Sequence, residues 1–219
     1  MRTRSALIVG LLLLCLSGCL WLPREPDAQP VVTYEEAFEN PASYAGTHTW
    51  ATVDTAISRV WVADGALQIT VHNEDHYQSS YPEAVETGDV FRLDVGVCKI
   101  AGPEESEFGV LFYRDSNDDF LRFTITGNGM MRFRKRQGGT WTDIVPLTSC
   151  TAVSQGADCN QITVIADGSE FDFYVNEQLV LEASDASFQR GGIGVIAANP
   201  KGSQDIHVGF PIVVLTELE

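Results

Sequence analysis

A cluster of basic residues stands out because the chain as a whole is strongly acidic, with a formal net charge of −16 at pH 7. The segment 118–141 contains the cluster. Its members are Arg122, Arg132, Arg134, Lys135 and Arg136. A guanidinium group matches a carboxylate through two parallel hydrogen bonds, so several arginines on one surface could bind an acidic ligand.

The apolar residues between these arginines predict which way the side chains point. Neighbouring side chains in a strand alternate between the two faces of a sheet. Two apolar sets are therefore expected to face the core. They are Leu121, Phe123 and Ile125 in one strand and Met131 and Phe133 in the next. The arginines at even positions then face away from the core.

The length of the loop between the two strands sets their register. A loop of residues 127–129 keeps both apolar sets on one face and pairs Thr126 with Met130, whereas a two-residue loop would turn one strand over. The longer loop places Arg122 directly opposite Arg134. Two like charges in that position destabilise a sheet unless carboxylates lie nearby or an anion binds.

Besides a surface for a protein partner, two interpretations of the arginine cluster remain open. In the first, the arginines bind an acidic saccharide, such as a polymer of uronic acids, with an aromatic ring as a stacking platform. The residues of this candidate site are Arg122, Arg132 and Arg134 with Tyr113 or Trp141. In the second, Asp94, Asp143 and other acids on neighbouring strands neutralise the arginines in a solvated network of ion pairs.

The segment Asp115–Phe120, DSNDDF, begins like a calcium-binding loop. It has acids at alternate positions, but Phe120 stands where such a loop needs glycine, and Thr126 stands where it needs glutamate. The segment is better explained as a polar turn between two strands. We expect no metal site and no cofactor, with calcium in a different geometry as the open alternative.

Three cysteines beyond the N-terminal region raise a question of pairing. Cys150 and Cys159 flank a short polar loop and form the natural disulfide in an oxidising compartment. Cys98 would then be free. A bridge from Cys98 to either of the others stays open, because sequence alone does not bring strands into register.

The N-terminal region predicts export. Arg2 and Arg4 precede the apolar run 6–16, which is too short to span a bilayer comfortably and is typical of a signal peptide. The residues LSGC that end at Cys19 resemble a bacterial lipobox, in which the cysteine receives a lipid. The resemblance implies a lipoprotein signal peptide over 1–18, and it implies that the mature protein is anchored to the outer membrane or the cell surface.

After the lipidated Cys19, the segment 19–33 contains three prolines and is predicted to be a semi-rigid tether. Cleavage before Cys19 removes Arg2 and Arg4, so the mature net charge becomes −18. Such a surface repels nucleic acid and anionic lipid head groups. The expected contact with a membrane is therefore through the acyl chains alone.

The remaining segment, 34–219, has the length of one well-buried domain. Short runs of alternating apolar and polar residues are separated by turn residues such as Asp64-Gly65 and Asp167-Gly168. No stretch has a convincing helical period. This pattern predicts an all-β fold built as an antiparallel sandwich or barrel.

An ordered set of segments sharpens this prediction. The order is EAFENP, VADGALQITV, FGVLFYRDSNDDFLRFTI, GGTWTDI, NQITVIADGSEFDFYVNEQLV, FQRGGIGVIA and VGFPIVV. It resembles the concanavalin A-like lectin/glucanase superfamily, and more narrowly the laminin-G and 3-keto-disaccharide hydrolase-like domains of bacterial surface lipoproteins. The resemblance implies an antiparallel two-sheet jelly-roll β-sandwich over 34–219, whose concave face often holds glycans.

The resemblance favours a noncatalytic surface module that binds a carbohydrate or a protein partner on its concave face. A glycoside-processing hydrolase of the same superfamily is the alternative, as is a purely structural lipoprotein. Glu170 and Asp172 resemble the catalytic carboxylates of laminarinase-like glucanases. The third carboxylate of that motif is out of place, because Glu177 lies beyond the turn at Asn176.

Overall fold

The structure, a computed structural model, describes residues 30–39, 49–72, 74–199 and 204–218. The predicted signal peptide 1–18, the lipidation site Cys19 and most of the predicted tether 19–33 lie outside the described residues. Regular secondary structure in the described part of the chain consists of β-strands. None of its segments is a helix long and apolar enough to cross a membrane.

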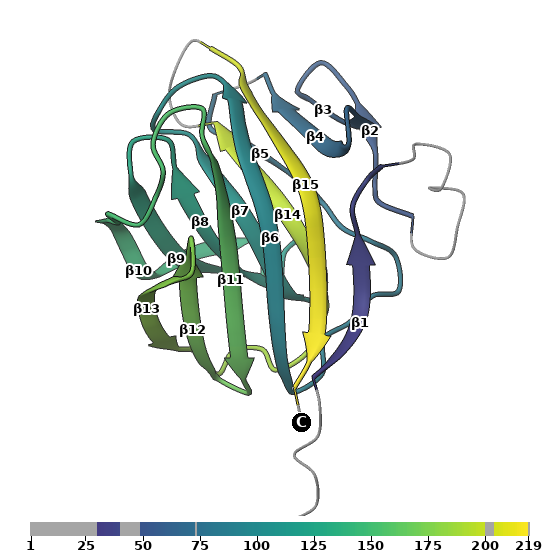
Figure 1. Ribbon diagram of the computed structural model, residues 1–219, viewed down its shortest axis with the longest axis vertical. Helices are drawn as coiled ribbons and strands as arrows, with labels where there is room; N and C mark the ends of the chain where they lie inside the picture. Colours follow the sequence, from purple (N-terminus) through teal and green to yellow (C-terminus); the bar gives the residue numbers. More distant parts are fainter. Residues whose placement is uncertain (1–29, 40–48, 73, 200–203, 219) are drawn as a thin grey trace, which may run out of the picture.

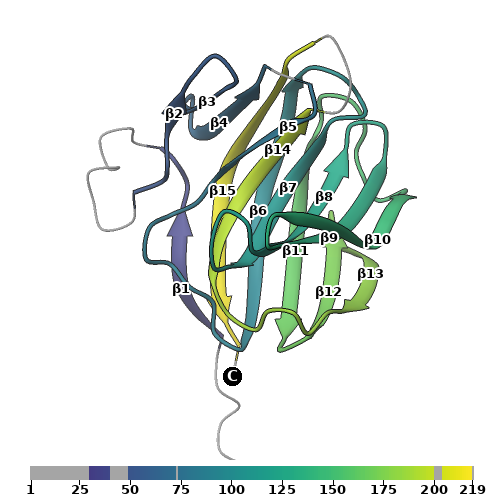
Figure 2. The same cartoon turned by 180° about the vertical axis from the view of Figure 1, so that it is seen from behind.

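The strands form two antiparallel sheets that pack face to face (Figures 1 and 2). The nine-stranded sheet has the order β13-β12-β11-β6-β15-β4-β3-β2, and β1 also pairs with β15. Its strands are β1 (Val31–Glu36), β2 (Val53–Asp54), β3 (Ser58–Ala63), β4 (Ala66–Val71), β6 (Val90–Ala101), β11 (Cys159–Asp167), β12 (Glu170–Val175), β13 (Gln178–Ser184) and β15 (Ile206–Glu217). This arrangement confirms the predicted jelly-roll sandwich.

The six-stranded sheet has the order β10-β9-β8-β7-β14-β5 and faces the viewer in Figure 2. Its strands are β5 (His76–Ser80), β7 (Glu107–Arg114), β8 (Phe120–Thr126), β9 (Met130–Gln137), β10 (Thr140–Ser149) and β14 (Gly192–Asn199). The arginine cluster lies in this sheet. Its two edge strands are β10 and β5.

An aromatic core joins the two sheets. Phe123 of β8 and Phe173 of β12 stack with ring centroids 4.5 Å apart, and Phe133 of β9 contacts Phe171 and Phe173. All the residues that were predicted to face the core are buried. Each fully buried apolar side chain of this size contributes about 1.5–3 kcal/mol of transfer free energy.

The hairpin between β8 and β9 has the predicted register. Gly129 donates a backbone hydrogen bond to Thr126, and Arg122 pairs with Arg134 across the two strands. Strand β1, in contrast, begins at Val31 and pairs with β15, so it includes the last residues of the segment assigned to the tether.

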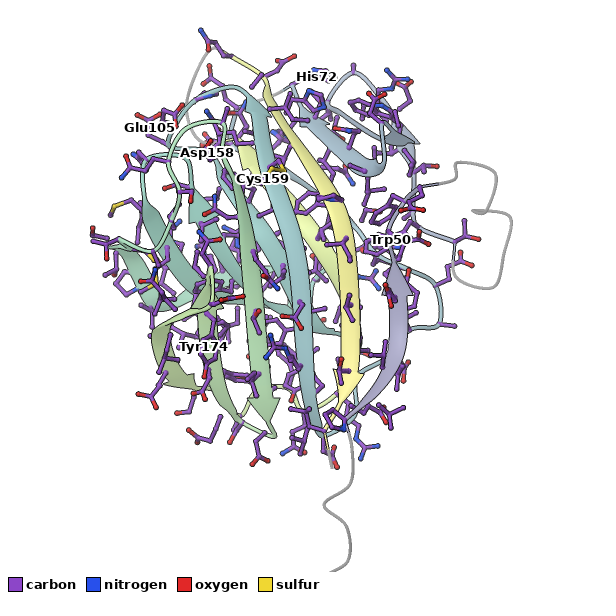
Figure 3. The ribbon with its side chains drawn as sticks, viewed as in Figure 1. Trp50, His72, Glu105, Asp158, Cys159 and Tyr174 are labelled. Carbon is purple, nitrogen blue, oxygen red and sulfur yellow. A yellow bond between two sulfur atoms is a disulfide. The ribbon has the colours of Figure 1, made fainter. Side chains whose placement is uncertain are left out.

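The expected disulfide between Cys150 and Cys159 is wrong. Cys98 of β6 lies directly opposite Cys159 of β11, with Cα atoms 4.1 Å apart, and these two cysteines form the disulfide. Figure 3 shows Cys159 and the yellow sulfur bond on the nine-stranded sheet. Cys150 directly follows β10 of the six-stranded sheet and is buried as a free thiol. Strand register decided the pairing, whereas loop length did not.

Candidate functional site

A groove of about 850 Å³ lies on the outer face of the six-stranded sheet. Its floor is formed by Arg122, Arg132 and Arg134, which alternate with the core residues of β8 and β9 as predicted. Trp141 and Tyr77 line one part of the groove, and Glu105, Pro103 and Asn199 line another. Figure 3 places Glu105 at the end of the molecule where β6 connects to β7.

Arg122 is the most deeply buried arginine of the floor, with only 3% of its side chain exposed. Nη2 donates a hydrogen bond of 2.8 Å to Oε2 of Glu107 on β7. Burial lowers the pKa of Arg122 to about 10, and the charge of Glu107 opposes that shift. The guanidinium remains charged at neutral pH and places a positive charge under the groove.

Glu107 links two arginines of the floor. Its second carboxylate oxygen accepts a hydrogen bond of 2.7 Å from Nη1 of Arg132, and Thr124 donates one of 3.0 Å to the first. Both oxygens of Glu107 therefore face donors of the protein itself.

Asp143 of β10 is the second counter-charge. Arg134 Nε lies 2.9 Å from Oδ1 of Asp143, and Arg132 Nε lies 3.5 Å from the same oxygen. Burial lowers the pKa of Arg134, against the influence of Asp143. The three arginines thus share two carboxylates, which leaves one positive charge in excess among these five side chains.

The prediction of which acids neutralise the arginines is correct for one residue and wrong for the other. Asp143 does so, but Asp94 lies on β6 of the other sheet and pairs with Arg92 there. Glu107 takes the place that had been assigned to Asp94. The sequence contained a signal for it, because Phe108, Val110 and Phe112 face the core and Glu107 must then start the outer face of β7.

Trp141 lies beside the arginines of the groove floor. The guanidinium carbon of Arg122 lies 4.4 Å from the centroid of the Trp141 ring, and that of Arg134 lies 4.6 Å away. Cations over an indole ring gain about 0.5–2 kcal/mol. Trp141 therefore orients the two like-charged arginines that face each other across the hairpin.

Tyr113, the other predicted platform, does not belong to the site. Its φ of 51° marks an irregularity where β7 pairs with β14, and the irregularity turns Phe112 and Tyr113 both toward the core. Its hydroxyl donates to the carbonyl of Gly168. Burial raises the pKa of Tyr113 to about 12. A bulge of this kind cannot be inferred from alternation alone.

The remaining two basic residues of the cluster have other partners. Arg136 contacts Asp118 at 2.8 Å. Lys135 faces the opposite side of β9 and donates to Asp185 and Ser187, beyond the end of β13. Lys135 therefore links the two sheets at their edge and takes no part in the groove.

Several polar atoms of the site are buried without a hydrogen-bond partner in the described residues. They are Nε of Arg122, Arg132 and Arg134, and Oδ1 of Asn199. The contact of Arg134 Nε with Asp143 is thus an ion pair that lacks hydrogen-bond alignment. A buried polar atom left unpaired costs about 1–3 kcal/mol. The buried arginines therefore lower the free energy of unfolding.

The other candidate sites take structural roles or lie elsewhere. In the turn Asp115–Phe120, Asp119 accepts hydrogen bonds from Ser116 and Gly138. Glu170 and Asp172 lie on β12 in the other sheet. Among the described residues, no three acidic, histidine or cysteine side chains come together in a way that could hold a metal ion.

This chain resembles known proteins in its fold and only weakly in its sequence. No protein-family model and no curated protein sequence matches the chain. The carbohydrate-binding module CBM66 from Bacillus subtilis is 16% identical with a TM-score of 0.59, and the match covers 74% of this chain and 91% of that one.

Two further solved structures have the same architecture. A protein of unknown function with a galectin-like fold from Bacillus subtilis is 11% identical with a TM-score of 0.64, covering 89% of this chain and all of that one. LamAcat from Zobellia galactanivorans is 8% identical with a TM-score of 0.56, covering 85% and 98%. These matches show a shared fold, the two-sheet antiparallel jelly-roll β-sandwich that the sequence resemblance implied.

Proposed function

We propose that this chain is a noncatalytic binding module that holds an acidic saccharide in the groove of the six-stranded sheet. The observation that carries the proposal is the buried arginine floor. Arg122, Arg132 and Arg134 share two carboxylates, and their buried Nε atoms have no hydrogen-bond partner in the described residues. Arg122 and Arg134 also lie beside Trp141. Costly arrangements of this kind are expected where function requires them.

The chemistry of the groove fits an acidic sugar. A carboxylate of the ligand would supply the missing negative charge, and charge-assisted hydrogen bonds of this type are stronger than neutral ones. The ring of Trp141 offers an apolar surface to the sugar ring. The name of the CBM66 structure, a carbohydrate-binding module, supports the same class of ligand.

The arrangement of carboxylates favours binding over hydrolysis. A glycosidase needs two carboxyl groups beside the scissile bond, one of them free to donate a proton. Glu107 and Asp143 instead contact the arginines. Glu170 and Asp172 lie on the other sheet. The hydrolase alternative would be supported by release of shorter sugars from a bound polysaccharide.

We also propose that the module is exported and lipid-anchored through Cys19 at the outer membrane or the cell surface. The signal-like residues 1–18 and the LSGC sequence support this placement. In cells given a labelled fatty acid, the wild-type chain should carry the label in the membrane fraction. Cys19→Ser should lose both, and a Cys19→Ser protein that still carries the label would contradict the anchor.

The binding proposal is tested with residues 30–219, which contain every described strand. The protein is applied to a panel of acidic and neutral polysaccharides, with calcium and with a chelator. We expect retention on uronate-containing polymers without cleavage and without a calcium requirement. Arg134→Gln should lose retention, whereas the matched control Arg92→Gln, an arginine of the other sheet, should keep it. Retention unaffected by Arg134→Gln would contradict the assigned site.

A further inference from the structure

The two edge strands of the six-stranded sheet meet above its outer face through their aromatic side chains. Tyr77 comes from β5 and Trp141 from β10, at opposite ends of the strand order. Their ring centroids are nevertheless 5.6 Å apart, with an interplanar angle of 84°. The sheet is therefore curved strongly enough for one aromatic bridge, Tyr77–Trp141, to span it.

The bridge rests on an apolar floor of its own. Leu111, Phe120 and Ile196 are each no more than 1% exposed and form a small cluster against Tyr77 and Trp141. Phe120 and Trp141 have ring centroids 5.6 Å apart. This packing fills the space beneath the bridge, so no ligand chain can pass under it.

The bridge separates two hollows. Tyr77 lines the groove of about 850 Å³ on one side and a smaller hollow of about 270 Å³ on the other. The smaller hollow is lined by Asn117 and Tyr81 and by none of the three floor arginines. The arginine groove is therefore blocked at the bridge, and its lining continues away from the bridge to Pro103, Glu105 and Asn199.

The charges of the lining side chains also differ along the groove. Of the three floor arginines, Arg122 and Arg134 lie against Trp141 of the bridge. Exposed Asp75 and Glu105 line the groove as well and add negative charge to its wall. A negative group is thus favoured next to the bridge, whereas further negative groups toward Asp75 and Glu105 would be repelled.

From this combination we infer that the groove recognises the end of a saccharide chain, in which one terminal acidic unit lies against the bridge and neutral units follow. This inference rests on the proposed function and narrows it. The acidic group of the terminal unit contacts Arg122 and Arg134. The following units leave along the groove past Pro103 and Asn199.

The test compares three oligosaccharides of equal length by titration calorimetry. One is neutral except for a single glucuronic acid at its non-reducing end, one is wholly neutral, and one is an oligogalacturonide with an acid on every unit. We expect the capped probe to bind at least about tenfold more tightly than either of the others. Adding neutral units to the capped probe beyond the length of the groove should not raise its affinity.

The outcomes distinguish the inference from the function on which it rests. If the oligogalacturonide binds as tightly as the capped probe, or if affinity keeps rising with the number of acidic units, end recognition is wrong while acidic-saccharide binding stands. If no acidic probe binds, both are wrong.

A variant tests the bridge itself. Tyr77→Ala removes one ring of the bridge, so the groove should no longer be closed there. The ratio of the affinities for the capped probe and the oligogalacturonide should therefore decrease. Tyr174→Ala, a tyrosine on the nine-stranded sheet that Figure 3 labels, is the matched control and should leave the preference unchanged. An unchanged preference in a folded Tyr77→Ala protein would overturn the role of the bridge. If that variant does not fold, the length series with the wild-type protein still decides the question.

Discussion

Arg122 and Arg134 are paired directly across β8 and β9, and both guanidinium groups lie over the same indole ring of Trp141. Two like charges at this position would repel each other in an isolated hairpin. Glu107 and Asp143, one on each side of the pair in the strand order, compensate for the repulsion. Because the two arginines depend on these carboxylates and on Trp141, replacing any of these residues should change binding or stability.

Removing the aromatic platform should weaken both binding and folding. Trp141→Ala deletes the ring that orients Arg122 and Arg134 and that covers Phe120. We expect affinity for an acidic oligosaccharide to fall by at least about tenfold, and the free energy of unfolding to fall by about 2 kcal/mol because the ring is only partly buried. Trp61→Ala, on the other sheet, is the control. Equal losses of affinity in both variants would argue against a specific platform.

Removing the central carboxylate should weaken the fold. Glu107→Gln leaves the buried Arg122 without its counter-charge, and breaking a buried ion pair on one side costs about 3 kcal/mol. Urea unfolding of the variant measures this cost. Asp54→Asn removes an acid that is 76% exposed from its pair with Arg59, so it should change stability by less than about 1 kcal/mol. Similar values for the two variants would contradict the account.

The disulfide gives a direct chemical prediction. When residues 30–219 are unfolded without reductant and treated with a thiol reagent, Cys150 should be the modified cysteine, because Cys98 and Cys159 are bridged. Peptide mass spectrometry identifies the labelled site. In the chain-entropy model, loss of a bridge with a sequence separation of 61 costs about 4 kcal/mol. Labelling of Cys98 in place of Cys150 would restore the pairing first expected from the sequence.

The pH dependence of stability should include a contribution from His207. Burial lowers the pKa of His207 below its ordinary 6.5, so the unfolded chain takes up a proton at a higher pH than the folded protein does. Stability is therefore fully present above pH 6.5 and declines as the pH falls through that value. We expect the decline between about pH 8 and about pH 5 to be smaller in His207→Gln. An identical decline in the two proteins would exclude His207 as a source.

Much of the fold could be predicted because local patterns determine it. The alternation around Phe123 and Phe133 predicted which side chains face the core, and the loop 127–129 predicted the pairing of Arg122 with Arg134. These features depend only on side-chain parity and on the length of one hairpin.

The features that could not be predicted depend on strands far apart in the sequence. Cys98 meets Cys159 because β6 and β11 are neighbours, and Tyr77 meets Trp141 because the whole sheet is curved. Tyr113 faces the core because of a local irregularity in β7. Alternation predicts a face within one strand, but it gives neither strand order nor curvature nor the position of a bulge.

The most direct test of the central claim compares a uronic acid oligosaccharide with its methyl ester, which has the same sugar skeleton without the charge. Each is titrated into residues 30–219 at low and at high salt. The account predicts that the acid binds, that binding weakens as salt increases, and that the ester binds at least about tenfold more weakly. Equal binding of acid and ester, or no binding of either, would contradict an arginine groove built for an acidic saccharide.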